Sequence, residues 1–134
     1  MSEVRILVVD DSAYVRNSLK TLLETSGYTV VAMAENGLDA LGKYKSHRPD
    51  LVMLDIIMPQ MDGLSTLRAL HQLDPSARVI MVTSISTRAS VMDCVKAGAK
   101  NYILKPFDKE KVIEAVQKVV GVRGEVPEAQ VGAE

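Results

Sequence analysis

The sequence predicts an α/β fold, a five-stranded parallel sheet with helices on both faces. Two observations predict it. Five short runs rich in Val, Ile and Leu scarcely alternate with polar residues, which is typical of strands buried on both faces. Each gap between these runs is long enough to hold one helix, and crossovers of that length join parallel strands. The predicted strands cover residues 4–9, 28–33, 51–54, 78–82 and 101–104.

The segments after the strands carry apolar residues at helical spacing. The second of these stripes is the weakest, because Gly42 lies inside it. Gly27 follows the first stripe, at the place where a left-handed residue commonly ends a helix. The stripes are Val15, Leu19, Leu22 and Leu23; Leu38, Leu41 and Tyr44; Leu64, Leu67 and Leu70; Ala89, Met92 and Val95; and Val112, Ala115, Val116, Val119 and Val120.

Length and composition indicate one domain. The chain has 134 residues, of which 47% are apolar and 25% charged, as in an ordinary soluble globule. The helical pattern ends at Gly121. We therefore expect a domain over residues 1–121 and a flexible C-terminal tail over 122–134.

Charge and cysteine content exclude several classes of function. The net charge of −1 gives no strong field to draw the chain onto nucleic acid or anionic lipid. Cys94 is the single cysteine, which excludes an intramolecular disulfide and a multi-cysteine metal site. The apolar runs are too short to span a bilayer, and the N-terminus MSEVRILVVDDS reaches acidic residues too early for a signal peptide. We expect a cytoplasmic protein without a nucleic-acid or membrane partner.

Polar residues stand where four of the predicted strands end. The first strand is followed by Asp10 and Asp11, the third by Asp55, the fourth by Thr83 and the fifth by Lys105. The carboxyl ends of parallel strands lie at one edge of the sheet, where open α/β sheets bind their ligands. The sequence therefore predicts that these side chains converge on one site.

The chemistry of this set favours a magnesium ion and a phosphoryl group. Three clustered carboxylates raise one another's pKa, and a hard divalent cation relieves that repulsion. A lysine and a hydroxyl beside a metal-bound carboxylate suit the oxygens of a phosphoryl group. No His or Cys accompanies the set in the sequence, which argues against zinc.

Four motifs carry a resemblance to a known family. They are VVDDS (8–12), DIIMPQMDG (55–63), Thr83 and KPF (105–107). Over residues 3–120 the chain resembles a response-regulator receiver domain of two-component signalling, and it is most similar to the stand-alone chemotaxis type. The resemblance implies the flavodoxin-like strand order 2-1-3-4-5.

The resemblance assigns roles to the residues at the predicted site. Asp55 is expected to accept a phosphoryl group from a phosphohistidine of a sensor histidine kinase. Asp10, Asp11, Asp55 and the backbone carbonyl of Ile57 are expected to hold Mg²⁺. The family pattern implies no enzyme in the usual sense, because such a domain catalyses only its own phosphoryl transfer and slow self-dephosphorylation.

The remaining implied roles concern a switch. Lys105 is expected to pair with the phosphoryl group, and Thr83 to turn toward it. Tyr102 matches the aromatic residue whose rotamer follows Thr83, and Lys105–Pro106 matches a cis peptide bond.

The implied output is protein binding by the fourth helix, fifth strand and fifth helix, where Lys111 and Lys118 supply positive charge. No DNA-binding segment follows the domain in this sequence. The expected partners are a kinase, a downstream protein target, for which the flagellar motor switch is a candidate, and a phosphatase.

Other residues have ordinary structural interpretations. Asp62 is expected to cap the helix that follows it, and Cys94 to pack in a helix. Two departures from the family pattern concern the site: Ser84 follows the switch threonine, and positions 57 and 85 are both Ile. Met33, Met53 and Met81 are expected to fill the core, and neither His47 nor His71 is expected to bind a ligand.

Three alternatives stay open at this point. A magnesium phosphohydrolase also uses an aspartate at a strand end, but it usually needs a cap domain for which this chain has no room. A flavodoxin-type FMN module needs a Ser/Thr/Gly-rich phosphate loop, whereas VVDDSAYV is acidic. The chain can also be a receiver cut from a longer regulator, with 122–134 as its linker.

Overall fold

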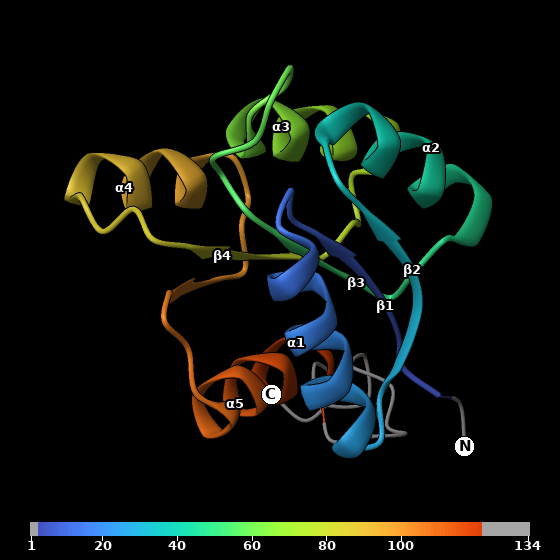
Figure 1. Cartoon of the computed structure of the whole chain (residues 1–134). Coiled ribbons are helices and arrows are strands. Elements are labelled where there is room, and N and C mark those ends of the chain that lie inside the picture. Colours follow the sequence, from blue (N-terminus) through green and yellow to red (C-terminus); the bar gives the residue numbers. More distant parts are fainter. Residues whose placement is uncertain (1–2, 122–134) are drawn as a thin grey trace, which may run out of the picture.

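The computed structural model describes residues 3–121 as five strands and five helices in strict alternation (Figure 1). All four strand pairings are parallel, and the order β2-β1-β3-β4-β5 confirms the expected topology. Within this range no helix is both long and apolar enough to cross a membrane. The tail expected over 122–134 lies outside the described residues. The elements are β1 (Arg5–Val9), α1 (Ala13–Thr25), β2 (Thr29–Ala34), α2 (Gly37–His47), β3 (Leu51–Leu54), α3 (Gly63–Leu73), β4 (Val79–Thr83), α4 (Arg88–Lys96), β5 (Asn101–Leu104) and α5 (Lys109–Val120).

The sheet separates two apolar cores, because successive strand side chains point to opposite faces. In β1, Ile6 and Val8 join the core beneath α1 and α5. Leu7 and Val9 join the core beneath α2, α3 and α4. Figure 1 shows α1 and α5 on one face of the sheet and the other three helices on the opposite face. The helices on both faces leave the ends of the strands open for a site.

Each helix begins at a polar residue whose side chain accepts a hydrogen bond from the backbone N–H three residues later. Asp62 caps α3 in this way, as predicted, with its Oδ1 2.8 Å from the nitrogen of Ser65. Ser12 caps α1, so neither Asp10 nor Asp11 serves as that cap. The caps are Ser12, Asn36, Asp62, Thr87 and Asp108.

The predicted apolar stripe of α2 is wrong at Leu38, whereas Tyr44 is buried and Leu41 packs partly buried against the core. Leu38 is 62% exposed, and the buried residues of α2 are Gly37, Ala40 and Tyr44. A side chain at Gly37 would meet Thr66 of α3, since an added Cβ would lie 2.2 Å from its Oγ1. The two helices approach closely at Gly37, and the adjacent Leu38 lies on the exposed side of α2.

The predicted apolar face of α4 is also wrong. Met92 and Val95 are 42% and 53% exposed, Ala89 is exposed too, and Cys94 is the buried residue of this helix. The spacing of three residues identified a helix but not the side that meets the sheet. The burial of Cys94 agrees with its predicted packing role, and so does that of Met53 and Met81, whereas Met33 is only partly buried.

Candidate functional site

Backbone hydrogen bonds extend the sheet by one residue and fix the polar residues at its carboxyl edge. The nitrogen of Asp10 donates to the carbonyl of Ala34 at 3.1 Å, and that of Asp55 to the carbonyl of Val9 at 3.1 Å. The nitrogen of Lys105 donates to the carbonyl of Thr83 at 2.8 Å. The backbone of each of these residues is therefore held by a hydrogen bond to the neighbouring strand.

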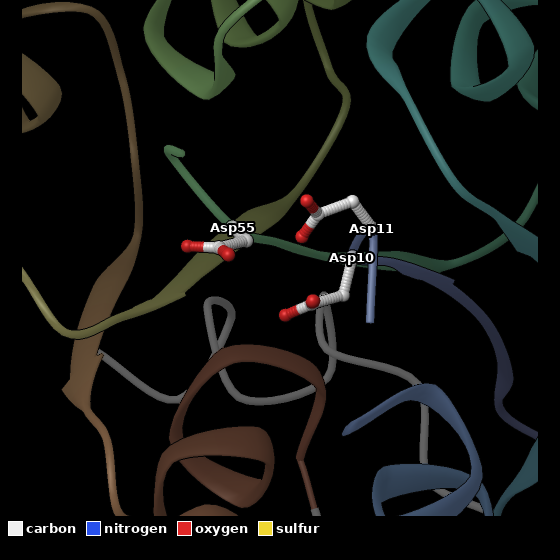
Figure 2. A group of neighbouring side chains, drawn as sticks. All are labelled: Asp10, Asp11 and Asp55. Carbon is white, nitrogen blue, oxygen red and sulfur yellow. The ribbon is translucent and has the colours of Figure 1, made fainter. Parts of the chain in front are cut away.

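Three carboxylates meet at this edge (Figure 2). Asp10, Asp11 and Asp55 each offer one oxygen, and these three oxygens lie within 4.8 Å of one another. Asp10 is 2% exposed and Asp55 5%, whereas Asp11 is exposed. The structure thus brings the three predicted carboxylates together and leaves one of them open to solvent.

Lys105 reaches both buried carboxylates. Its Nζ lies 2.7 Å from Oδ2 of Asp10 and 3.1 Å from Oδ2 of Asp55. Burial raises the pKa of Asp10, against the lowering effect of Lys105. Burial alone would lower the pKa of Lys105, but its hydrogen bonds to the two aspartates outweigh this and raise it. One ammonium thus pairs with two of the three carboxylates, so the ionised cluster keeps a surplus of negative charge.

Backbone donors orient the two buried carboxylates. The nitrogen of Ser12 lies 2.9 Å from Oδ1 of Asp10, and the nitrogen of Ile56 lies 2.7 Å from Oδ1 of Asp55. Each carboxylate therefore receives one backbone donor on Oδ1 and the lysine on Oδ2. This arrangement fixes the rotamers without neutralising the charge.

Gly63 allows α3 to begin directly against the backbone of Asp55. Its nitrogen donates to the carbonyl of Ile56 at 2.7 Å, and an added Cβ would lie 2.1 Å from the carbonyl oxygen of Asp55. Sequence reasoning missed this role. The signal was available in the sequence: Gly63 directly follows the helix cap, at a position where glycine is unfavourable for the helix itself.

Thr83 and Tyr102 approach the same loop from two strands. Thr83 is fully buried at the end of β4, and the nitrogen of Ile85 lies 3.4 Å from its Oγ1. The hydroxyl of Tyr102 donates to the carbonyl of Ile85 at 2.7 Å. Ser90, in the first turn of α4, places its Oγ 3.1 Å from the same hydroxyl. Sequence reasoning did not single out Ser90.

Comparison with known proteins decides the family. The family model described as the response regulator receiver domain matches residues 6–117. This chain belongs to the response regulator receiver domain family. Receivers of this type accept a phosphoryl group in two-component signalling. The assignment decides against the phosphohydrolase and FMN-module alternatives.

The receiver is similar to chemotaxis proteins over most of its length. It is 47% identical to the chemotaxis protein CheY of Bacillus subtilis, covering 87% of this chain and 97% of that protein. It is 42% identical to CheY of Thermotoga maritima, covering 86% and 96%. It also resembles a chain in the CheX–CheY–BeF3–Mg complex of Borrelia burgdorferi, with a TM-score of 0.84, 38% identity and coverage of 86% and 87%.

The carboxylate cluster of this receiver fits a hard divalent cation. Receiver domains bind Mg²⁺ at an acidic cluster, and the donors here are carboxylate oxygens with no His or Cys in the group of described residues. Mg²⁺ prefers a few carboxylates together with retained waters, and the exposed Asp11 leaves a side open to water. The side chain of Ile57, in the following loop, is exposed.

A groove of about 530 Å³ opens beside the site of this receiver. It runs between the start of α1 and the segment after β5, and its lining includes Tyr14, Ser84, Lys105 and Phe107. Lys105–Pro106 is a cis peptide bond, as the resemblance implied. The groove therefore reaches Lys105 of the site from the α1 side.

Proposed function

We propose that this receiver accepts a phosphoryl group on Asp55 from a phosphohistidine of a sensor histidine kinase. In this step a carboxylate oxygen of Asp55 attacks phosphorus, the phosphorus–nitrogen bond breaks, and its electron pair returns to the imidazole. The observation that carries the proposal is the position of Asp55, buried, held by Lys105 at 3.1 Å and placed among two further carboxylates.

Asp10, Asp11, Asp55 and the backbone carbonyl of Ile57 would hold Mg²⁺, which supplies positive charge next to the phosphoryl oxygens. Lys105 pairs with one of these oxygens and keeps its proton, since its pKa is raised. Thr83 turns its hydroxyl toward the phosphoryl group. Beyond its own phosphorylation and slow self-dephosphorylation, the receiver acts on no separate substrate.

The output surface in this proposal is the face of α4, β5 and α5. Met92, Val95 and Leu104 are large apolar side chains exposed there, and Lys111 and Lys118 of α5 are exposed cations. Apolar residues bordered by charge are typical of protein-binding surfaces. We propose a downstream protein target, with the flagellar motor switch as the chemotaxis candidate, and a phosphatase as a further partner.

We also propose that the protein works in the cytoplasm, and that residues 1–121 are the receiver and 122–134 a C-terminal tail. A chain ending at Gly121 should accept phosphate as fast as the full chain. A large loss of labelling in the shortened chain would contradict this division.

Labelling with acetyl phosphate tests the phosphoacceptor. Asp55→Asn should abolish the label, because an amide oxygen is a poor nucleophile. Asp62→Asn is the matched control, since Asp62 caps α3 and asparagine caps a helix equally well. Robust labelling of the Asp55→Asn chain would contradict the assignment of Asp55 as the phosphoacceptor.

The switch has its own test. Thr83→Ala should still be labelled, yet it should transmit the change to the output face poorly. Beryllofluoride imitates the phosphoryl group, and NMR signals from α4, β5 and α5 report the response. A response of Thr83→Ala as complete as that of the wild-type chain would show that Thr83 and Tyr102 are not coupled.

A further inference from the structure

A chain of hydrogen bonds joins α4 to the loop that follows Thr83. The chemistry of the groups determines which of them donates and which accepts. Tyr102 has one hydroxyl hydrogen, and the carbonyl of Ile85, 2.7 Å away, can only accept. The hydrogen of Tyr102 is therefore committed to Ile85. It follows that Ser90, at 3.1 Å, donates its own hydroxyl hydrogen to the oxygen of Tyr102.

We propose that Ser90 is a positioning residue of the switch, whose hydroxyl holds Tyr102 in place under the β4–α4 loop. The proposal rests on the proposed switch role of Tyr102. It adds Ser90 as the residue that determines how firmly Tyr102 is held. Ser90 touches neither the carboxylate cluster nor its lysine in any contact that the structure shows. It acts through Tyr102.

The weak attachment of α4 explains why one hydroxyl matters. Among its residues only Cys94 is buried, whereas the described part of α5 buries Val112, Ala115, Val116 and Val120. Little apolar area therefore holds α4 against the sheet. Ser90 lies in the first turn, where its nitrogen lies 3.3 Å from the capping Oγ1 of Thr87. The bond to Tyr102 ties this turn to β5.

Ile85 connects the bond to the phosphoacceptor site. Its nitrogen donates to Thr83 Oγ1 at 3.4 Å, and its carbonyl accepts from Tyr102. A turn of the Thr83 hydroxyl toward a phosphoryl group removes the partner of this nitrogen. The populations of two arrangements of Tyr102 then shift, and the hydroxyl of Ser90 stabilises one of these arrangements.

The ionisation of Tyr102 supplies an independent readout. Burial raises the pKa of Tyr102, and the hydrogen bond from Ser90 lowers it, because a donated hydrogen stabilises the phenolate. Removing the Ser90 hydroxyl should therefore raise the pKa of Tyr102 further. A serine that merely fills space would not change this titration.

The experiment is a double-mutant cycle on Ser90→Ala and Tyr102→Phe, followed by amide hydrogen exchange in α4. Without any phosphoryl mimic, Ser90→Ala should speed exchange of the first turn two- to tenfold, the range of one neutral hydrogen bond. The double variant should match Tyr102→Phe alone. Ser90→Thr, which keeps the hydroxyl, should restore the wild-type rate. Additive effects of the two substitutions would overturn the proposal.

Ser65→Ala is the matched control, because Ser65 is the third residue after the cap of α3, as Ser90 is after the cap of α4. It should leave both α4 exchange and the Tyr102 titration unchanged. In a second cycle, the affinity for beryllofluoride should change two- to tenfold for Ser90→Ala and not at all in the Tyr102→Phe background. Equal changes in both backgrounds would contradict the proposal. Acetyl phosphate labelling of Asp55 tests the proposed function separately, so the two ideas can fail independently.

Discussion

The two edges of the sheet both hold carboxylates, but they differ in how completely these are paired. At the carboxyl edge, Asp10, Asp11 and Asp55 lie together, and within the described chain the structure pairs this cluster with Lys105 alone. Burial raises the pKa of Asp10 there. The charged form of Asp10 is therefore disfavoured until a further cation arrives.

At the amino edge, Asp74 ends α3 and is surrounded by donors. The hydroxyl of Tyr44 lies 2.7 Å from its Oδ2, while the nitrogen and hydroxyl of Ser76 lie 3.0 and 2.7 Å from its Oδ1. Arg48 adds a guanidinium at 3.9 Å. The hydrogen bond from Tyr44 is the chief cause of the lowered pKa of Asp74.

The difference separates a structural polar group from a binding site. A carboxylate with a full set of donors stabilises the fold in its charged form. A buried carboxylate short of cations costs stability and is available to a ligand. Identical residue types thus serve opposite purposes at the two edges, and pairing distinguishes them.

The largest effect that we predict tests how rigidly the carboxyl edge is built. Gly63→Ala should destabilise the protein by about 3 kcal/mol, because the new Cβ would lie 2.1 Å from the carbonyl oxygen of Asp55, which is backbone and cannot move aside. Urea unfolding measures this. Gly42→Ala is the control: nothing lies within 4 Å of its Cβ position, and alanine should stabilise α2 by about 0.5–1 kcal/mol. A harmless Gly63→Ala would mean that the edge is not rigid.

The next prediction concerns the surplus charge itself. Mg²⁺ should raise the free energy of unfolding, by about 2.7 kcal/mol at a hundred times its dissociation constant. Asp11→Asn should remove most of this effect, whereas Asp93→Asn, at an exposed site on α4, should not. Protons compete for Asp10, whose pKa is raised, so the stabilisation should shrink as the pH falls toward the carboxylate range. Equal stabilisation of all three chains would place the ion elsewhere.

Much of the carboxyl edge was predictable because strand direction determines it. Once the apolar runs are taken as parallel strands, the residues that follow them must meet at one edge. β3 and β5 have their predicted bounds, and Asp10, Asp55 and Lys105 lie where the strand ends place them. The assignment of roles came from the family motifs, not from the strand pattern.

Contacts between helices and the sheet were less predictable. The exposure of Leu38 and the close approach of α2 to Thr66 are not encoded in the period of the sequence. The contact of Ser90 with Tyr102 joins residues 12 positions apart on a helix and a strand. This contact depends on the exact position of α4 against the sheet. Only one side chain of α4 is buried to fix that position.

A smaller effect tests the amino edge. Tyr44→Phe should lower the free energy of unfolding by about 1.5 kcal/mol, the lower end of the range for a hydrogen bond to a charged group. The pKa of Asp74 is lowered in the folded state, so its contribution is present above the ordinary carboxyl pKa and is lost as the pH falls below it. The difference between the two chains should therefore narrow in acid. Mg²⁺ should stabilise both chains equally, because Tyr44 lies at the edge without surplus charge.

The last prediction concerns how long the phosphorylated state survives. It involves Ile57 and Ile85, which we call the rim of the carboxyl edge. Under the proposed function, phosphate is lost when water attacks phosphorus in line with the leaving carboxylate of Asp55. A polar side chain at position 57 or 85 can orient that water. Both are Ile here, with Ile57 57% exposed and Ile85 half-buried in the loop after Thr83. Neither side chain offers a hydrogen bond.

We therefore expect a state that is long-lived for a chemotaxis-type receiver unless a phosphatase supplies its own polar group. Ile57→Asn and Ile85→Glu should each speed loss of phosphate by about an order of magnitude, about 1.4 kcal/mol in the barrier. The main-chain bonds of Ile85 to Thr83 and Tyr102 do not depend on its side chain, so its substitution tests the rim rather than the switch. Leu38→Asn, at an exposed apolar residue of α2, should leave the lifetime unchanged. If all four chains lose phosphate at one rate, the apolar rim does not govern the lifetime, and the negative charge of the edge alone must account for it.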